Sequence, residues 1–568
     1  MISKHFLLIS CYEIAFVSGK TRNVVFLPDE NVALKNPLLL SVIESLGLQY
    51  LMLNQSQMSR STSHWIFKSE HFKTLRFVWT ETDSVHPNSY RTISKTSPIQ
   101  LNQIPGFDVL TNDDKFAHHL KRMRRHYGEA RFRYVPHYFL LPRDIKHYTA
   151  THTKIKKLVQ YDEKLTSDPH SYQRFIARML AVNVSEAPKA HSNRILSNLT
   201  EVKQLLAQHE NGIVEVRQYI EPFLLAGHKF NFGVYVAVLS ISPLRIYSYR
   251  SRLIKIAYKK YPKVMQSKTT PLAYTFDTYI APWEFPPLMK HFVEFPSPNS
   301  EGSDAWEIVK NYMRSYGLDV NQMEEEVTDA IVTTVLSVRK HWEKEIQNIV
   351  GDTSHSNKFV QLFKFDFEID DIGRPWLIQV HSVPNLKPVQ SVLSTDEAFR
   401  KDILLDFLKL VNVAGHPDTI HGASKGNVGH YCAEMCGEKH FWDRKCWECP
   451  NVPKKSEALF NFSQEYTRRG KFDLLFPSLE KKYDWIESGM SYDVTRNDFR
   501  LLFDASIVLT NSNEGSLSST FCTYRSHCSG HGDCVNGKCV CDEGYEGRTC
   551  YILKDFGMER MRIAEKSF

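Results

Sequence analysis

The chain carries two kinds of hydrophobic pattern, one with the period of a strand and one with that of a helix. Short apolar or alternating segments predict strands, at residues 22–28, 74–79, 214–220, 232–241, 244–250, 359–369 and 375–381. Apolar residues three or four positions apart predict helices, at residues 113–125, 200–209, 304–316 and 321–350. Because strands and long helices intermix between residues 20 and 415, we predict an α/β body over this range.

Composition and charge add only broad limits. Of the 568 residues, 42% are hydrophobic and 24% are charged, as in folded soluble proteins. The length allows about three or four domains. The net charge of +7 is too small to predict a nucleic-acid partner. A denser basic run, KRMRR at residues 121–125, is either a solvated helix face or a surface for an acidic polypeptide.

The cysteines are unevenly distributed, because Cys11 stands alone and the other ten follow residue 430. Six of them, in residues 522–550, have the spacing C-x5-C-x5-C-x4-C-x-C-x8-C. A segment this short cannot bury enough apolar surface to fold without covalent or metal cross-links. The spacing and the Gly-Tyr of GYEG resemble an epidermal-growth-factor-like (EGF-like) module, with a zinc site as the alternative. The resemblance implies three disulfides, Cys522–Cys534, Cys528–Cys539 and Cys541–Cys550.

Disulfides persist in oxidising compartments, so this module predicts a location in the secretory lumen or outside the cell, with the cytoplasm as the alternative. The N-terminal residues 1–19 have a basic residue and a short apolar run, typical of a signal peptide or short membrane anchor. A buried first strand or a mis-assigned start would also explain them. A second cluster, Cys432, Cys436, Cys446 and Cys449, predicts either a zinc site or two further disulfides.

Five stretches of the body, in series, resemble the tubulin-tyrosine-ligase-like family. They read NQIPGFDVLTNDDKFAHHLKRM, FRYVPHYFLLP, VEVRQYIEPFLLAGHKFNFGVYVAVLSI, FVQLFKFDFEIDDIGRPWLIQVHSVPNL and EYTRRGKFDLLFP. The resemblance implies an ATP-grasp fold with α+β lobes. It also implies ATP-dependent ligation of amino acids to tubulin through an acyl phosphate, a reaction that requires ATP and Mg²⁺.

The residues at the implied metal site differ from what magnesium requires. Mg²⁺ prefers hard oxygen ligands, above all carboxylates. The resemblance places the family's Asp at Asp366, but Gln379 stands where the family has Glu, and His381 where it has Asn. An imidazole nitrogen suits zinc or copper better than magnesium. By itself, Asp366 is also explained as a strand carboxylate paired with a neighbouring cation.

The implied nucleotide site departs from the family as well. Arg178 stands where the family has a phosphate-binding Lys, and the loop that follows contains no glycine, although amides that wrap a phosphate generally need glycine. Arg217 stands where a Gln approaches the adenine, and Lys255 where an Arg faces the sugar-phosphate or substrate. Lys229 of the KFDLR motif is retained, whereas Asn231 and Gly233 replace its Asp and Arg.

These features define a predicted domain order. It comprises a signal or anchor (1–19), the ATP-grasp-like body (20–415), a Cys/His linker (416–455), a helical extension of the body (456–505), a linker (506–521), the EGF-like module (522–550) and a tail (551–568).

Two functional hypotheses follow from the altered site. The first is a pseudoenzyme that serves as a binding module in the secretory pathway or outside the cell, with no cofactor and an unidentified protein partner. The second is an active ATP-dependent ligase that adds an amino acid such as glutamate to tubulin or another acidic protein tail. Ligation of an unrelated lumenal substrate by a rebuilt site is a third.

Overall fold

The computed structural model describes the α/β body and short parts of the C-terminal region. The described residues are 24–27, 37–52, 75–80, 91, 99–161, 175–180, 194–196, 199–208, 213–242, 244–262, 271–276, 278–288, 305–351, 356–382, 395–413, 465–466, 468–476, 532–535, 538–543, 545–546 and 552–553. The chain divides into two compact units, Met1–Thr419 with Arg468–Asp493, and Ile420–Thr467 with Val494–Phe568.

The first unit begins with a small parallel sheet. Its strand order is β2 (Gln49–Met52), β1 (Val24–Leu27), β3 (Leu75–Val78), β4 (Gln100–Leu101). Helix α2 (Pro37–Ser45) forms the crossover between β1 and β2, as parallel neighbours require. The short helix α5 (Asp108–Thr111) and helix α6 (Asp113–Tyr127) follow this sheet.

A second sheet is antiparallel and carries its own helices. Its order is β5 (Tyr138–Leu141), β8 (Ile213–Gln218), β6 (Phe175–Leu180), β7 (Arg194–Leu196). One face packs its apolar side chains against α7 (Ile145–Tyr161) and α8 (Leu199–Gln208). Since side chains alternate along a strand, the residues between these apolar positions, including Arg217, lie on the opposite face.

The third sheet is the largest and is built around the 14-residue strand β10 (His228–Ile241). Its main strand order is β13 (Tyr279–Ile280), β12 (Leu253–Ala257), β10, β11 (Leu244–Tyr249), β16 (Phe472–Phe476). Strands β9 (Leu224–Leu225) and β14 (Gln361–Ile369) also pair with β10, and β15 (Pro375–His381) pairs with β14. Longer helices accompany it, α10 (Ala305–Ser315), α11 (Val320–Val350) and α12 (Thr395–Leu410). Short 3₁₀ turns occur at Glu129–Phe132, Pro271–Ala273, Pro282–Glu284 and Ser356–Lys358.

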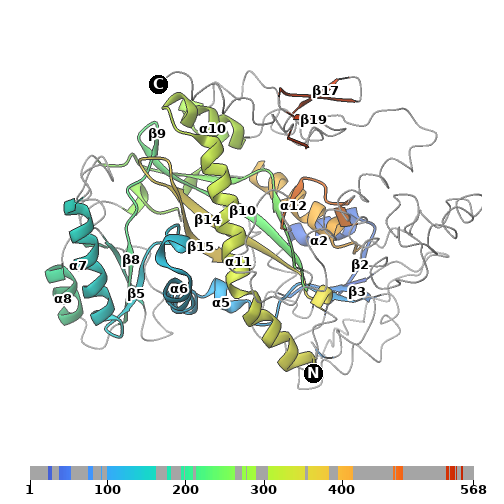
Figure 1. Ribbon diagram of the computed structural model, residues 1–568. Helices are drawn as coiled ribbons and strands as arrows, with labels where there is room; N and C mark the ends of the chain where they lie inside the picture. Colours follow the sequence, from blue (N-terminus) through green and yellow to red (C-terminus); the bar gives the residue numbers. More distant parts are fainter. Residues whose placement is uncertain are drawn as a thin grey trace, which may run out of the picture. The chain divides into compact units, whose positions relative to one another are not determined.

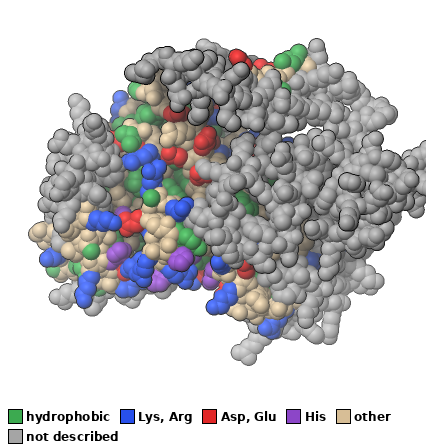
Figure 2. Space-filling model, viewed as in Figure 1, with side chains coloured by type: hydrophobic (Ala, Val, Ile, Leu, Met, Phe, Trp, Pro, Cys, Tyr) green, Lys and Arg blue, Asp and Glu red, His purple; other side chains and the backbone are tan. Residues whose placement is uncertain are grey.

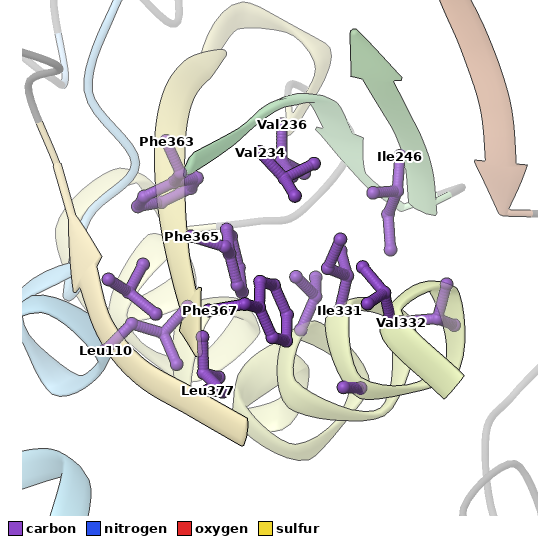
Figure 3. Packing of buried hydrophobic residues seen from close by; sticks show 14 of the residues in the cluster. Leu110, Val234, Val236, Ile246, Ile331, Val332, Phe363, Phe365, Phe367 and Leu377 are labelled. Atoms are coloured by element: carbon purple, nitrogen blue, oxygen red, sulfur yellow. The ribbon is translucent and has the colours of Figure 1, made fainter. Parts of the chain in front are cut away.

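Helix α11 covers one face of this sheet (Figure 1). Phe363, Phe365 and Phe367 of β14 are fully buried. Phe365 and Phe367 lie toward Ile331 and Val332 of α11 (Figure 3), whereas the Phe363 ring stacks with Trp342 of the same helix. The opposite face of the same sheet packs against α2 and α12 through a separate apolar cluster. Strand β14 is therefore buried on both faces, although its apolar side chains alternate with Lys364, Asp366 and Glu368.

The strands and helices expected from periodicity are confirmed within four residues at each end, and the predicted helical extension contains a strand in its described part. Residues 456–505 were expected to form a helical extension, whereas Phe472–Phe476 form strand β16. This strand pairs antiparallel with β11, and Arg250 at the end of β11 holds Asp473 at 2.7 Å. The free edge of β11 supplies hydrogen-bond partners that sequence periodicity cannot reveal.

In the second unit, the described residues form two small hairpins. Strands β17 (Gly532–Val535) and β18 (Lys538–Cys541) pair with Cys534 opposite Cys539, and β19 (Tyr545–Glu546) pairs with β20 (Ile552–Leu553). The sequence between β17 and β18 is Asn-Gly, the dipeptide most typical of a tight hairpin. Cys541 is disulfide-bonded.

Several sequence predictions fall on residues outside the described part of the chain. These are the N-terminal segment 1–19, Cys522, Cys528 and Cys550, the cluster Cys432, Cys436, Cys446 and Cys449, and the glycine-free loop after Arg178. The three predicted disulfide pairings therefore stay predictions. No described helix is long and apolar enough to cross a bilayer.

Candidate functional site

Strand register brings the predicted metal-site residues together on one face of the third sheet. Asp366 of β14 lies opposite Gln379 of β15, and His381 lies opposite Lys364. On the other side of β14, Gly233 of β10 lies opposite Asp366. The strand pair expected from the sequence is thus confirmed, and Asp366, Gln379 and His381 are neighbours.

The Asp366 carboxylate is bound by two basic side chains. Lys364 Nζ and His381 Nε2 each lie 3.0 Å from the same oxygen, Asp366 Oδ2. The side chains of Lys364 and Asp366 are only 5% and 11% exposed. Burial alone would raise the pKa of Asp366, but Lys364, the hydrogen bond from His381 and Lys255 together hold it well below its ordinary value. Asp366 is therefore an ionised carboxylate that already has counter-ions.

Lys364 was not among the residues expected from the sequence, and Gly233 explains how it fits. A Cβ atom on Gly233 would lie 2.9 Å from Asp366 Oδ1 and 3.1 Å from Lys364 Cδ. The missing side chain at Gly233 leaves the space that the Lys364 stem and the Asp366 carboxylate occupy. The sequence signal for Lys364 was its position as the single basic residue in the apolar run FKFDF.

Lys255 lies next to this cluster on β12. It is opposite Asn231 of β10, and its Nζ lies 5.5 Å from the centre of the Tyr279 ring. Burial and the nearby charge of Lys364 lower the pKa of Lys255 to about 8. The Oδ1 atom of Asn231 is buried and has no hydrogen-bond partner among the described residues.

Lys229, the retained member of the KFDLR motif, is engaged in a buried ion pair. Its Nζ lies 3.0 Å from Glu368 Oε2, and the two side chains are 4% and 10% exposed. The ammonium also lies 5.1 Å from the centre of the Tyr219 ring. Glu368, like Lys364, is a partner that sequence reasoning missed.

Arg217 is held by protein groups on three sides. Its guanidinium donates to the carbonyl oxygen of Ile378 at 2.9 Å, to Asp113 at 2.8 Å and to Glu215 at 3.2 Å. These contacts connect β8 with α6 and β15. Arg178 lies on β6, opposite Glu215 of β8.

The donor set does not fit a magnesium site of the kind the sequence resemblance implies. Asp366 is the one carboxylate of the three predicted ligands, and its Oδ2 atom is shared by Lys364 and His381. Gln379 brings no charge, and the free Asn231 Oδ1 is a neutral acceptor. Among the described residues, no group of three His, Cys, Asp or Glu side chains is arranged to hold a metal ion.

Comparison with known proteins agrees with the residue patterns. The model of the tubulin-tyrosine ligase family matches residues 91–419, more than half of the chain. The model of a teneurin-like EGF domain matches residues 525–552, which supports the EGF-like module.

Curated relatives are distant and longer than this chain. Mouse tubulin monoglutamylase TTLL4 is 22% identical over 414 residues, covering 67% of this chain and 31% of the relative. Mouse probable tubulin polyglutamylase TTLL2 is 24% identical over 320 residues, covering 56% and 51%. Tubulin polyglutamylase TTLL7 of Xenopus tropicalis is 24% identical over 349 residues, covering 60% and 34%. The chain thus matches about a third to a half of the length of these relatives.

Proposed function

Because the chain belongs to the tubulin-tyrosine ligase family, we propose that it keeps the ligase body as a binding module and does not perform Mg·ATP chemistry. One observation carries this proposal. The single carboxylate retained at the metal site, Asp366, already binds Lys364 and His381 through one oxygen atom. The protein thus places basic groups where the family chemistry needs a divalent cation.

Electrostatics supports the proposal. Two unit charges about 4 Å apart interact by roughly 4 kcal/mol at an effective dielectric constant of about 20, so a divalent ion near one ammonium is disfavoured by about 8 kcal/mol. One carboxylate offers an attraction of similar size, which the nearby lysine cancels. The family has a Glu where this chain has Gln379. Among the described residues, no second carboxylate at this position supplies the negative charge that would attract a divalent ion.

The proposed setting is the secretory pathway or the cell exterior. The six-cysteine pattern of residues 522–550 and the disulfide at Cys541 support it, because such bonds persist in oxidising compartments. The proposed partner is another protein, bound by the α/β body, the EGF-like module or both.

An active ligase is the second candidate, and the relatives favour it. Their names describe tubulin monoglutamylases and polyglutamylases, and Asp366 and Lys229 stand at family positions. In this case the chain would use ATP and Mg²⁺ to add glutamate to an acidic tail of tubulin or of another protein.

Calorimetry of the full chain with Mg·ATP separates these candidates. We expect no magnesium-dependent binding, and we expect Asp366→Asn to leave the titration unchanged. A glutamylating relative serves as the positive control, and circular dichroism checks the fold of the variant. Micromolar affinity that needs Mg²⁺ and falls at least tenfold in Asp366→Ala would refute the proposal.

The location is tested separately by mass spectrometry of chain isolated from cells with its thiols blocked. We expect the cysteines of residues 522–550 to be fully disulfide-bonded. Free thiols at all six positions would contradict a location in the secretory pathway.

A further inference from the structure

A basic cavity lies at the edge of the second sheet, between α6, β5 and α7. Its volume is about 450 Å³. Lysine, arginine and histidine side chains gather at the lower left of Figure 2, where Figure 1 places α6, β5 and α7. Arg217 and Ile378 close the cavity on the side of β8 and β15, but Asp366, Lys364 and Lys255 do not line it. The cavity therefore borders the implied nucleotide site at Arg217, but the cluster around Asp366 lies outside its lining.

The carboxylates of this cavity are already neutralised. All three that line it form ion pairs with lining cations, namely Asp113 with Arg217 at 2.8 Å, Asp144 with Arg143 at 2.8 Å and Glu129 with Lys154 at 2.7 Å. Asp114 adds a second carboxylate to Arg143 at 2.6 Å. Each lining carboxylate thus has a lining cation as its close ion-pair partner.

Three lining cations of α6, namely Lys121, Arg124 and Arg125, form no close ion pair with a carboxylate of the described residues, although Asp144 and Glu129 act on Lys121 and Arg124 from farther away. Positions i, i+3 and i+4 lie on one face of a helix, with Cβ atoms about 5–6 Å apart. Arg124 is the most buried of the three, and burial lowers its pKa. Its guanidinium donates to the carbonyl oxygens of Phe132 and Val135 at 2.9 and 2.6 Å.

Two of the three lining histidines, His137 and His147, add polar groups and no charge at neutral pH. Burial and the adjacent Arg124 lower the pKa of His137 to about 3. Arg124 Nη1 lies 3.4 Å from His137 Nδ1. Because a guanidinium can only donate, Nδ1 accepts this hydrogen bond, and the ring proton of the neutral imidazole is on Nε2. Burial and Lys121 lower the pKa of His147 as well. The positive charge of the cavity therefore comes from the three cations of α6.

We propose that this cavity binds a compact anion that carries two or more adjacent phosphate groups. The volume matches the pockets that hold small molecules and headgroups, whereas an extended acidic peptide requires an open groove. Arg125 has a planar guanidinium group, which can bind phosphate through two parallel hydrogen bonds, whereas Arg124 adds positive charge while its donors are engaged by the Phe132 and Val135 carbonyls. A phosphate group also offers more acceptor oxygens than a single carboxylate, so it can use more of the N–H donors around the cavity.

Titration of the full chain with inorganic pyrophosphate, followed by calorimetry, tests this site. We expect binding, and we expect Lys121→Gln/Arg125→Gln to weaken it at least tenfold. Both side chains are exposed on α6, so this double variant should keep the fold. Arg125→Gln alone should weaken binding about threefold. Arg124 is left unchanged because its hydrogen bonds support the loop after α6.

Two controls locate the site. Lys401→Gln/Lys409→Gln on α12 removes the same number of charges away from the cavity, and Lys255→Gln removes a cation from the implied nucleotide site. Both should keep the affinity within about twofold. Loss of binding in Lys255→Gln, with none in Lys121→Gln/Arg125→Gln, would place pyrophosphate in the nucleotide site and overturn the proposal.

The remaining outcomes are also decisive. No binding of pyrophosphate, or equal binding by wild type and Lys121→Gln/Arg125→Gln, would overturn the proposed site. Binding of a hexaglutamate peptide as tight as that of pyrophosphate would show that the site selects acidic peptides and overturn the phosphate assignment. ATP also carries adjacent phosphates, so the two experiments are separated by their controls: binding at the implied metal site depends on Mg²⁺ and Asp366, whereas binding in this cavity depends on Lys121 and Arg125.

Discussion

Replacing Lys229 by methionine should destabilise the α/β body by about 3–5 kcal/mol, the usual cost of removing one partner of a buried ion pair. The Lys229 and Glu368 side chains are 4% and 10% exposed, with 3.0 Å between Nζ and Oε2. The substitution leaves the Glu368 carboxylate buried without its cationic partner. Methionine keeps most of the apolar stem, so lost volume contributes little.

Urea denaturation followed by tryptophan fluorescence measures this change. The double variant Lys229→Met/Glu368→Leu should recover at least about 2 kcal/mol, because an apolar pair needs no counter-ion. The matched control is Lys154→Met, which breaks the exposed pair with Glu129 and should cost at most about 1 kcal/mol. The reasoning fails if Lys229→Met costs no more than this control, or if the double variant is as unstable as the single one.

Two further predictions concern His119 and Gly233. Burial and Arg122 lower the pKa of His119 to about 4, so the unfolded chain binds the proton more readily and stability should fall by up to about 3 kcal/mol as the pH drops from 6.5 to 4. His119→Gln should flatten this part of the profile of stability against pH, measured by denaturation, because Gln does not titrate. The Gln side chain can still hydrogen-bond to Arg122 and Ser337, so the fold should be kept. An unchanged slope would contradict the assignment to His119. Gly233→Ala should cost about 1–3 kcal/mol, because the new Cβ would lie 2.9 Å from Asp366 Oδ1, and an unchanged denaturation midpoint would show that the site has free space.

Local patterns were sufficient where contacts are close in the sequence. The strands on either side of a short turn predicted that Asp366, Gln379 and His381 would be neighbours, and the register confirms it. The period of 3.6 residues predicted the long helix at 321–350, which the structure shows as Val320–Val350. The cysteine spacing likewise indicated the EGF-like module that the family comparison supports.

The partners of the site residues were beyond the reach of local patterns. Gly233 faces Asp366 only because β10 pairs with β14, more than a hundred residues later in the chain. Strand β16 forms for the same reason, since its hydrogen-bond partners belong to β11. A periodicity of two or 3.6 residues reports which face of an element is apolar, and it carries no information about which distant strand lies alongside.

The sequence by itself therefore determined the α/β class, the family resemblance and the replacement of magnesium ligands by Gln379 and His381. Only the tertiary structure decided that Lys364 and His381 share one oxygen of Asp366 and that Glu368 binds Lys229. The physical reason is that charge balance in a buried site depends on distances of a few ångströms between separate strands. Those distances are set by sheet register and packing, which no single segment encodes.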